Sequence, residues 1–365
     1  MDHKGRLKRL RAAFERNHLD VLVVTHLPNI RYLCGFTGTA GVVVVSEQGS
    51  RLFTDGRYTD QARAEVEECK VTITGKPPLA AAPAWLKDHW SHLVRKRPCW
   101  VGIESERLTV AGRRQLSNLL PAGFRLRETG GLVERLRMVK DADEIECLRK
   151  AAALGASLFD SALKTIRPGV KETEVAAEME YVARLAGATE MSFPTIIAAG
   201  KRSALPHGRA STAAIPARGF VVCDFGAILA GYCSDRTRTV HVGRPGSEAR
   251  RTYKAVQEAQ RAAIAAVKPG VSVGDVDREP RKILKNSNLA RFFTHSTGHG
   301  VGLEIHEAPR VAAGQSEMLC PGMVITIEPG VYVTGQGGVR IEDVVAVTER
   351  GCEILAPSST ELITI

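Results

Sequence analysis

Two hydrophobic patterns alternate along the first part of the chain. Residues 5–17 space their large apolar side chains three and four positions apart, as an amphipathic helix does. The apolar runs at 19–24 and 41–46 are typical of buried strands instead. Because helical and strand-like patterns keep alternating to about residue 130, we expect an α/β domain there.

The pattern changes near residue 134, where we place a domain boundary. A long helical pattern begins at Asp141, and strand-like runs separate it from later helical segments. Helices packed on a sheet made of hairpins form an α+β fold. The sequence therefore predicts an α/β domain over 1–134, followed by an α+β domain over 135–365.

The second part of the chain contains a repeat. In the segments 162–170 and 263–271, an apolar helix ends at a basic residue followed by Pro-Gly-Val, and another helical pattern begins. The two segments lie 101 residues apart (263 − 162), which favours the duplication of a helical hairpin. Pro280 falls about eight residues into the last helix. Because an interior proline removes a hydrogen bond, we expect that helix to kink or to start later.

Composition narrows the functional class. The chain has 365 residues, of which 44% are hydrophobic and 25% charged, as is ordinary for a soluble protein of two domains. Its net charge of +10 is dispersed and matches no nucleic-acid motif, so we expect no nucleic-acid partner. No apolar run is long enough to span a membrane, and the charged N-terminal segment does not resemble a signal peptide. The eight cysteines form no C-x-x-C pair, and we predict reduced thiols in a cytoplasmic protein.

Four acidic residues lie within otherwise apolar strand patterns. Asp224 interrupts VVCDFGA, and Asp235 follows GYCS. Glu328 ends VITIE, and Glu342 lies within VRIEDVV. A buried ionised carboxylate is costly unless it is paired or bound to a metal ion, so four of them together favour a metal site.

The spacing of these residues suits two hairpins. Ten residues separate Asp224 from Asp235, and thirteen residues with a Gly-rich turn separate Glu328 from Glu342. Adjacent antiparallel strands bring each pair of carboxylates together, and bridging carboxylates hold two metal ions about 3.5–4 Å apart. Oxygen donors with one imidazole favour Mn, Co, Fe or Zn over a thiolate-type site.

Histidines are the candidates for the remaining donor. His299 has a glycine on each side, so its backbone can approach a ligand closely, and we predict that it is the imidazole ligand. His306 follows seven residues later, which is also the spacing of one helix face, but the glycines argue against a helix. His207 follows a proline in a turn-like segment, and its position alone gives no argument for chemistry.

These segments closely resemble the pita-bread metallopeptidases, in particular the Xaa-Pro peptidases prolidase and aminopeptidase P. The matching motifs follow the family's order over residues 205–347 and are LPHG, VVCDFGA, GYCSDRTRT, THSTGHGVGLEIHEAP, PGMVITIEPGVY and GGVRIEDVVAVT. NIRYLCGFTG and LFTDGRYTDQA resemble the family's creatinase-like N-terminal domain. The resemblance implies such a domain over 1–134 and a pita-bread catalytic domain over 135–365.

The resemblance also implies roles for individual residues. Two divalent metal ions, Mn²⁺ with Co²⁺ or Zn²⁺ as alternatives, would have five ligands: Asp224, Asp235, His299, Glu328 and Glu342. Glu328 would also carry a proton from the bound water to the leaving imino nitrogen. Four further residues would contact the substrate or orient the site: His207, His306, Arg310 and Arg340. Among them, His306 would stabilise the tetrahedral intermediate, and Arg310 would meet the substrate's C-terminal carboxylate.

The activity implied is hydrolysis of the Xaa-Pro bond of dipeptides by a homodimer, with short proline-containing peptides as substrates. The main alternative is an aminopeptidase that acts on longer peptides, but a compact N-terminal domain and Arg310 favour the dipeptidase. The creatinase-like domain argues against methionine aminopeptidase, and the intact ligands argue against creatinase, which needs no metal. A non-catalytic pita-bread binding module would be expected to have lost ligands that this chain retains.

Overall fold

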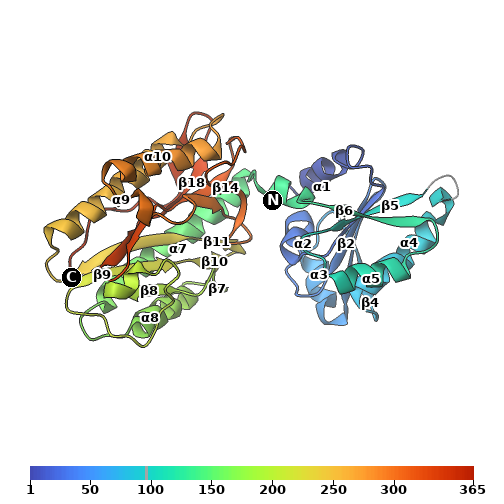
Figure 1. Cartoon of the computed structure of the whole chain (residues 1–365). Coiled ribbons are helices and arrows are strands. Elements are labelled where there is room, and N and C mark those ends of the chain that lie inside the picture. Colours follow the sequence, from blue (N-terminus) through green and yellow to red (C-terminus); the bar gives the residue numbers. More distant parts are fainter. Residues whose placement is uncertain (95–97) are drawn as a thin grey trace. The chain divides into compact units, whose positions relative to one another are not determined.

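The computed structural model describes residues 1–94 and 98–365, and the side chains of all residues outside 89–97. The chain divides into two compact units, Met1–Arg137 and Met138–Ile365 (Figure 1). This division lies three residues after the boundary that we placed at residue 134 (137 − 134).

The N-terminal unit contains one mixed sheet with helices. Its strands are β1 (Val21–Val24), β2 (Val42–Ser46), β3 (Gly49–Asp55), β4 (Lys70–Thr74), β5 (Cys99–Glu104) and β6 (Phe124–Thr129). Its helices, with the short 3-10 helix η1, are α1 (His3–Ala12), α2 (Leu27–Cys34), η1 (Gly56–Tyr58), α3 (Thr59–Glu65), α4 (Pro78–Val94), α5 (Val110–Leu119) and α6 (Leu132–Arg137). The strand order is β4-β3-β2-β1-β5-β6, and β1 pairs antiparallel with β2 and parallel with β5.

Strand β1 lies in the interior of this sheet because all four of its residues are apolar. Val21 and Val23 belong to one apolar cluster with Leu86 of α4. Successive side chains of a strand point to opposite faces, and Leu22 and Val24 are also fully buried. A strand without a polar face needs cover on both sides, and the predicted α/β arrangement supplies it.

The C-terminal unit contains four helices and several hairpins, as the α+β prediction requires. Its helices, with the 3-10 helices η2 and η3, are α7 (Ala142–Thr165), α8 (Glu172–Leu185), η2 (Gly200–Ala204), α9 (Ser247–Ala266), α10 (Val273–Asn286) and η3 (Ala290–Phe292). Its strands are β7 (Glu190–Met191), β8 (Ile196–Ala199), β9 (Gly219–Phe225), β10 (Ala227–Leu229), β11 (Tyr232–Cys233), β12 (Arg236–Val242), β13 (Gly298–Gly300), β14 (Glu307–Val311), β15 (Val324–Ile327), β16 (Gly330–Val333), β17 (Gly337–Arg340), β18 (Asp343–Val347) and β19 (Cys352–Ile354).

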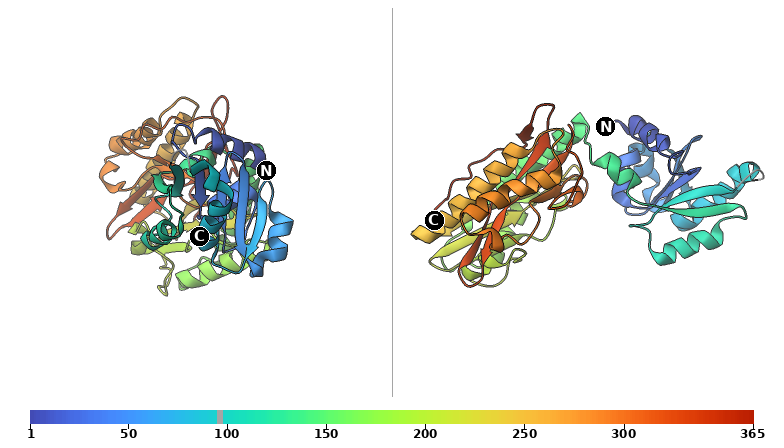
Figure 2. Two further views of the ribbon diagram at one scale, coloured as in Figure 1. Left: turned by 90° about the vertical axis from the view of Figure 1, so that its right-hand side faces the viewer. Right: turned by 45° about the horizontal axis from the view of Figure 1, so that its top comes forward.

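The helices of this unit pack in pairs on two sheets. Side chains of α7 and α8 pack on the sheet β12-β9-β8. Side chains of α9 and α10, which lie side by side (Figures 1 and 2), pack on the sheet β14-β13-β15-β18-β19. Two smaller sheets, β11-β10-β7 and β16-β17, complete this unit. The functional residues predicted from the sequence lie on the hairpins or on the loops that connect them.

The repeat in the sequence has a structural counterpart. Gly169 links α7 to α8 with a φ of 88°, and Gly270 links α9 to α10 with a φ of 79°, both in the left-handed region that favours glycine. The N–H of Gly169 donates to the carbonyl of Ile215 at 2.9 Å, and that of Gly270 donates to the carbonyl of Leu319 at 2.8 Å. The two helical hairpins therefore turn and attach in the same way, as expected of a duplication.

Pro280 lies inside α10, which runs from Val273 to Asn286. The expectation that this helix starts later is therefore wrong. Proline has no N–H to donate to the carbonyl of Val276, but Val276 and Leu284 are fully buried in the apolar cores. Packing of an apolar face supplies most of the stability of helices in proteins, and here it outweighs the local cost.

The described helices are all too short or too polar to cross a membrane. All eight cysteines are free thiols, as predicted. Burial raises the pKa of the Cys223 and Cys233 thiols to about 12, so both remain neutral near pH 7 and pack as small apolar side chains.

Candidate metal centre

Two hairpins position the four acidic residues. Strand β9 pairs antiparallel with β12, with Asp224 opposite Thr237, and Asp235 immediately precedes β12. Glu328 follows β15 and Glu342 precedes β18, and these two strands also pair antiparallel. The backbone N–H of Glu342 donates to the carbonyl of Thr237 at 3.1 Å. This hydrogen bond joins the two hairpins and brings their carboxylates to one place.

His299 lies in the short strand β13 between two glycines. A Cβ atom at Gly298 would lie 1.9 Å from the carbonyl oxygen of Thr326, and one at Gly300 would lie 2.2 Å from that of Ala308. The neighbouring strands therefore require both glycines, whereas from the sequence we ascribed them to the approach of a ligand. The Nδ1 atom of His299 lies 3.0 Å from the carbonyl oxygen of Gly300, so Nδ1 carries the hydrogen and Nε2 keeps its lone pair.

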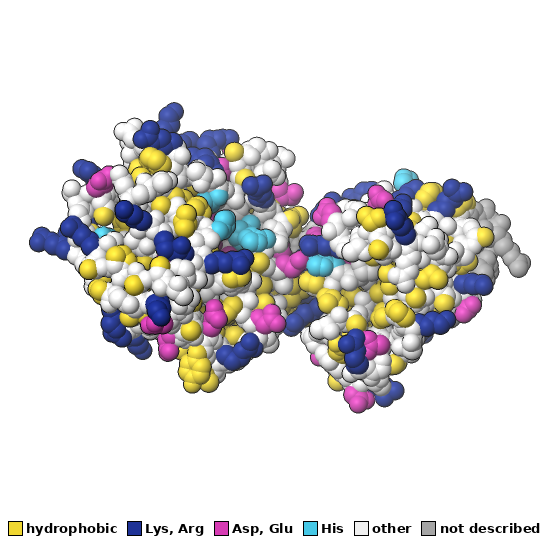
Figure 3. Space-filling model, turned by 60° about the horizontal axis from the view of Figure 1, so that its bottom comes forward, with side chains coloured by type: hydrophobic (Ala, Val, Ile, Leu, Met, Phe, Trp, Pro, Cys, Tyr) yellow, Lys and Arg dark blue, Asp and Glu magenta, His cyan; other side chains and the backbone are white. Residues whose placement is uncertain are grey.

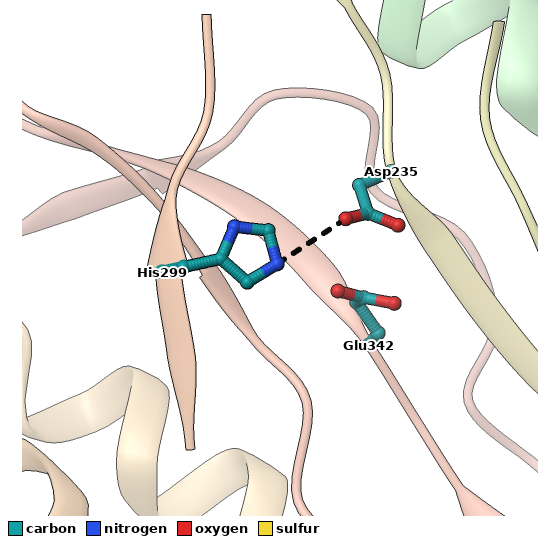
Figure 4. Close-up of side chains that lie close together, drawn as sticks. All are labelled: Asp235, His299 and Glu342. Atoms are coloured by element: carbon teal, nitrogen blue, oxygen red, sulfur yellow. Dashed lines mark ion pairs between the residues drawn. The ribbon is translucent and has the colours of Figure 1, made fainter. Parts of the chain in front are cut away.

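The Nε2 atom of His299 faces the carboxylates (Figure 4). It lies 3.5 Å from Oδ2 of Asp235 and 3.6 Å from Oε1 of Glu328. Asp235, His299 and Glu342 each offer one donor atom within 4.8 Å of the other two. Because 3.5 Å is too long for a good hydrogen bond, these groups are arranged as ligands around a common ion would be.

Two of the carboxylates have one oxygen held by the protein and one that is not. Oδ2 of Asp224 accepts a hydrogen bond from Arg340 at 2.5 Å, and Oε2 of Glu342 accepts one from the hydroxyl of Thr237 at 2.6 Å. Oδ1 of Asp224 and Oε1 of Glu342 are buried and have no hydrogen-bond partner among the described residues. Because buried polar atoms are nearly always paired, these two oxygens are available to ligate a metal ion.

The carboxylates repel one another in this buried position. Burial, followed by the charges of Glu342 and Asp224, raises the pKa of Asp235 well above its usual value. Burial and Glu342 raise the pKa of Glu328 in the same way, and burial and Asp224 raise that of Glu342 to about 8. The cation of Arg340 opposes these shifts without cancelling them. These carboxylates retain protons because too little positive charge lies near them. A divalent ion that binds there displaces those protons.

The cluster lines a cavity of about 690 Å³ within the C-terminal unit, a volume typical of small-ligand sites. His207, His306 and Arg310 line the same cavity as exposed residues, whereas Arg340 is buried. Figure 3 shows histidine side chains gathered on one face, with Lys and Arg side chains next to them. The rings of His299 and His306 are in edge contact, 4.3 Å apart, although the two residues do not share a helix. The structure thus brings all the predicted site residues to one cavity.

Two polar residues that the sequence did not single out lie beside the cluster. Nε2 of His295 lies 2.9 Å from the hydroxyl oxygen of Tyr332, and this oxygen accepts a hydrogen bond from Arg340. Burial and the charge of Arg340 lower the pKa of His295 to about 4, so its ring is neutral near pH 7. The close spacing of His295 and His299 in THSTGHG is a signal that would have identified the histidine. Tyr332 lies in an apolar strand pattern that gives no such signal.

Comparison with known proteins identifies the family. Residues 146–349, or 204 of the 365, match the model of metallopeptidase family M24, and residues 6–139 match that of the creatinase/prolidase N-terminal domain. The chain belongs to metallopeptidase family M24. The resemblance stated from the sequence motifs is confirmed, and with it the order of the two folds.

The M24 chain is similar to other proteins over its whole length. It is 36% identical to a Xaa-Pro dipeptidase of Pyrococcus furiosus, over 99% of this chain and 100% of that protein. The solved structure of a Xaa-Pro dipeptidase from Bacillus anthracis matches at 39% identity with a TM-score of 0.94, and the match covers 100% of both chains. The solved structure of an X-Pro aminopeptidase from Thermotoga maritima matches at 34% identity with a TM-score of 0.88, covering 99% of this chain and 100% of that one.

Membership of this metallopeptidase family implies that the protein uses divalent metal ions. The buried carboxylates and His299 are suitable ligands for such ions. Asp224 and Glu342 each present a buried oxygen without a hydrogen-bond partner in the described part of the chain. Burial lowers the pKa of His299 to about 4, so its Nε2 atom is an unprotonated donor near neutral pH. Carboxylate and imidazole donors suit Mn²⁺, Co²⁺ or Zn²⁺.

Proposed function

We propose that this metallopeptidase hydrolyses the bond before proline in Xaa-Pro dipeptides. The observation that carries the proposal is a single cavity that combines the buried carboxylate cluster with the exposed cation of Arg310. In a dipeptide the free carboxylate lies one residue from the scissile bond, within reach of a cation at the cavity wall, and a guanidinium binds a carboxylate in two-pronged geometry. The Xaa-Pro dipeptidases from Pyrococcus furiosus and Bacillus anthracis, which are similar to this chain over its whole length, support the same substrate class.

The cavity also has an apolar side that suits a proline ring. Its apolar lining residues are Phe193, Pro194, Ile196, Pro206 and Ile305. In a mostly apolar pocket, the few polar groups that point into it fix the orientation of a small substrate. The apolar residues would bind the pyrrolidine ring, and the polar groups would set the direction of the peptide bond.

We propose that two divalent ions, Mn²⁺ in the first place and Co²⁺ or Zn²⁺ as alternatives, occupy the cluster. Its five donor residues are Asp224, Asp235, His299, Glu328 and Glu342. Four carboxylates carry about as much negative charge as two divalent ions carry positive charge, which supports two ions over one. Metal analysis of the purified protein tests this proposal. Fewer than two ions per chain, together with no turnover after addition of Mn²⁺ or Co²⁺, would favour a non-catalytic binding module instead.

The residues around the cluster have separate tasks in this proposal. Divalent ions would lower the pKa of a bound water molecule to near 7. Glu328 would accept the proton of that water and pass it to the imino nitrogen of the leaving proline. Burial and His207 lower the pKa of His306, so its neutral ring would donate a hydrogen bond to the developing oxyanion. His207 would contact the substrate near the scissile bond, and Arg340 would hold Asp224 in place through their hydrogen bond.

The dipeptidase proposal is tested by comparing Ala-Pro with Ala-Pro-Ala on metal-loaded protein. We expect a kcat/KM for the dipeptide at least tenfold above that for the tripeptide. Comparable values for the two substrates would instead support an Xaa-Pro aminopeptidase, the activity in the name of the similar protein from Thermotoga maritima.

The assembly and location belong to the same proposal. We propose a homodimer in the cytoplasm that acts on short proline-containing peptides and binds neither nucleic acid nor membranes. Sedimentation of the metal-loaded protein tests the dimer, and a mass of 39.5 kDa in solution, that of one chain, would contradict it.

A further inference from the structure

The cavity contains three arginines, and only one of them has an internal counter-charge. Arg340 is hydrogen-bonded to Asp224. The guanidinium groups of Arg209 and Arg310 have no hydrogen bond and no ion pair with any side chain or carbonyl in the part of the chain that the structure describes. Both residues are exposed and both line the cavity. Two unpaired cations thus lie on the wall of a site that is otherwise acidic at its base.

The backbone at Arg209 is held firmly although its side chain is free. Its N–H donates to the carbonyl of His207 at 2.9 Å, and its carbonyl accepts from Nη2 of Arg202 at 2.8 Å. Arg202 is itself paired with the fully buried Glu172 at 3.0 Å. The next residue, Ala210, donates its N–H to the carbonyl of Thr195. Arg209 is therefore presented to the cavity from a fixed loop, which reduces the entropy lost when its side chain binds a ligand.

The remaining acidic groups of the cavity do not neutralise Arg209. The four carboxylates of the cluster are buried, and the proposed metal ions would balance their charge. Glu307, the other acidic residue on the cavity wall, lies 3.4 Å from the ammonium of Lys140. An anionic group on the substrate would then be the counter-ion for the exposed arginines.

We propose that Arg209 is a specificity-determining residue that binds the C-terminal carboxylate of the dipeptide together with Arg310. This inference rests on the proposed dipeptidase function. Two guanidinium groups on one carboxylate favour a substrate that ends immediately after proline, because a longer peptide replaces that anion with a neutral amide. Arg209 would thus select for peptide length and would take no part in the chemical step.

The test compares substrates that differ only in this charge. Metal-loaded wild type, Arg209→Ala and Arg209→Lys are assayed with Ala-Pro and with Ala-Pro amide. We expect Arg209→Ala to raise KM for Ala-Pro about tenfold, as the loss of a charge-assisted contact does, with kcat changed less than twofold and KM for the amide changed less than twofold. Arg209→Lys should restore part of the lost affinity for Ala-Pro only. Equal increases in KM for the acid and the amide would overturn the proposal.

Two controls test whether Arg209 contacts the substrate carboxylate. The first tests for general electrostatic attraction, and the second tests for a contact with the residue before proline. Arg251→Ala removes the same charge from an exposed position of α9 outside the cavity, and it should leave KM for Ala-Pro unchanged. If Arg251→Ala raised KM as much as Arg209→Ala, general electrostatic attraction would replace the proposed contact. A larger effect of Arg209→Ala on Glu-Pro than on Ala-Pro would assign Arg209 to the side chain before proline, and would also overturn the proposal.

A binding measurement distinguishes failure of this inference from failure of the proposed function. Calorimetric titration of the metal-loaded protein with proline and with prolinamide requires no turnover. We expect wild type to bind proline more tightly than prolinamide, and Arg209→Ala to lose most of that difference. If the wild type cleaves neither Ala-Pro nor Ala-Pro-Ala but shows this binding pattern, the proposed function fails and the role of Arg209 in carboxylate binding stands. If the variant keeps the full preference for proline, the role of Arg209 fails whatever the activity.

Discussion

The ammonium of Lys140 lies 3.4 Å from the carboxylate of Glu307, and both side chains are almost completely buried, at 1% and 6% exposure. The other carboxylate oxygen of Glu307 accepts the backbone N–H of Glu304 at 3.0 Å. Glu307 directly follows His306, which lines the cavity. This buried ion pair therefore anchors the loop that presents His306 to the cavity.

We predict that Lys140→Met destabilises the protein and lowers kcat. Removing one partner of a buried ion pair leaves an uncompensated charge and costs about 3–5 kcal/mol. The melting temperature should fall by several degrees, and kcat should fall because His306 is less well held. Lys150→Met is the matched control, since Lys150 is exposed and lies 3.8 Å from the exposed Glu146, a type of pair that contributes about 0–1 kcal/mol. If the two variants melt at the same temperature as wild type, the ion pair has no anchoring role.

We predict that Thr237→Val weakens metal binding. The hydroxyl of Thr237 donates to Glu342 at 2.6 Å and lies 3.2 Å from Nε of Arg340. Losing a group that orients a metal ligand typically reduces metal affinity by about 10–100-fold. Thr237→Ser keeps the hydroxyl and should bind metal within about threefold of wild type. Isothermal titration with Mn²⁺ measures both affinities, and similar values for Val and Ser would show that the hydroxyl does not matter.

The sequence predicted the parts of the site that local patterns determine. Asp224 and Asp235 stood out because acidic residues interrupt apolar strand patterns, and their spacing specified the hairpin that the structure contains. His299 stood out because a glycine lies on each side of it. The glycines are needed for a different reason than the approach of a ligand, because Gly298 and Gly300 allow neighbouring strands to lie close. Their roles as ligands stay predictions until a metal ion is located.

Contacts between distant residues could not be predicted in the same way. Lys140 and Glu307 are 167 positions apart, and neither has a sequence context that indicates burial. Likewise, the hydrogen bond between His295 and Tyr332 depends on how the segment before β13 is placed against β16 in the fold. Helix α10 shows the opposite limit. The local cost of Pro280 suggested a kink or a later start, whereas the helix begins at Val273 and tertiary packing keeps the residues before Pro280 helical.

We predict that the metal-free protein loses stability as pH rises from 6.5 to 8. Burial raises the pKa of Glu342 from its usual 4.5 to about 8, so in this range the folded state holds a proton that the unfolded state has released. Rising pH then favours unfolding. The pKa values of His299 and His295 are lowered from 6.5 to about 4, which has the opposite effect, but most of that effect lies below pH 6.5. Melting temperatures in chelator at several pH values measure this, and a higher melting temperature at pH 8 than at pH 6.5 would contradict the prediction.

The last prediction separates the electrostatic cost of the cluster from its use as a metal site. Glu342→Gln removes one of the mutually repelling carboxylates while keeping the shape of the side chain. In chelator at pH 8 we therefore expect the variant to melt at a higher temperature than wild type, because a buried charge disfavoured by its neighbours is gone. On addition of Mn²⁺ the order should reverse, since wild type gains stability by binding the ion and the variant lacks a ligand.

Glu353→Gln is the control for this last comparison. Glu353 is exposed in β19, and its loss should change neither the chelated nor the Mn²⁺-loaded melting temperature by more than about a degree. A Glu342→Gln protein that is less stable than wild type in chelator would mean that Glu342 contributes to the fold by itself. In that case its hydrogen bond with Thr237, and not the cost of clustered charge, would dominate the energetics of the site.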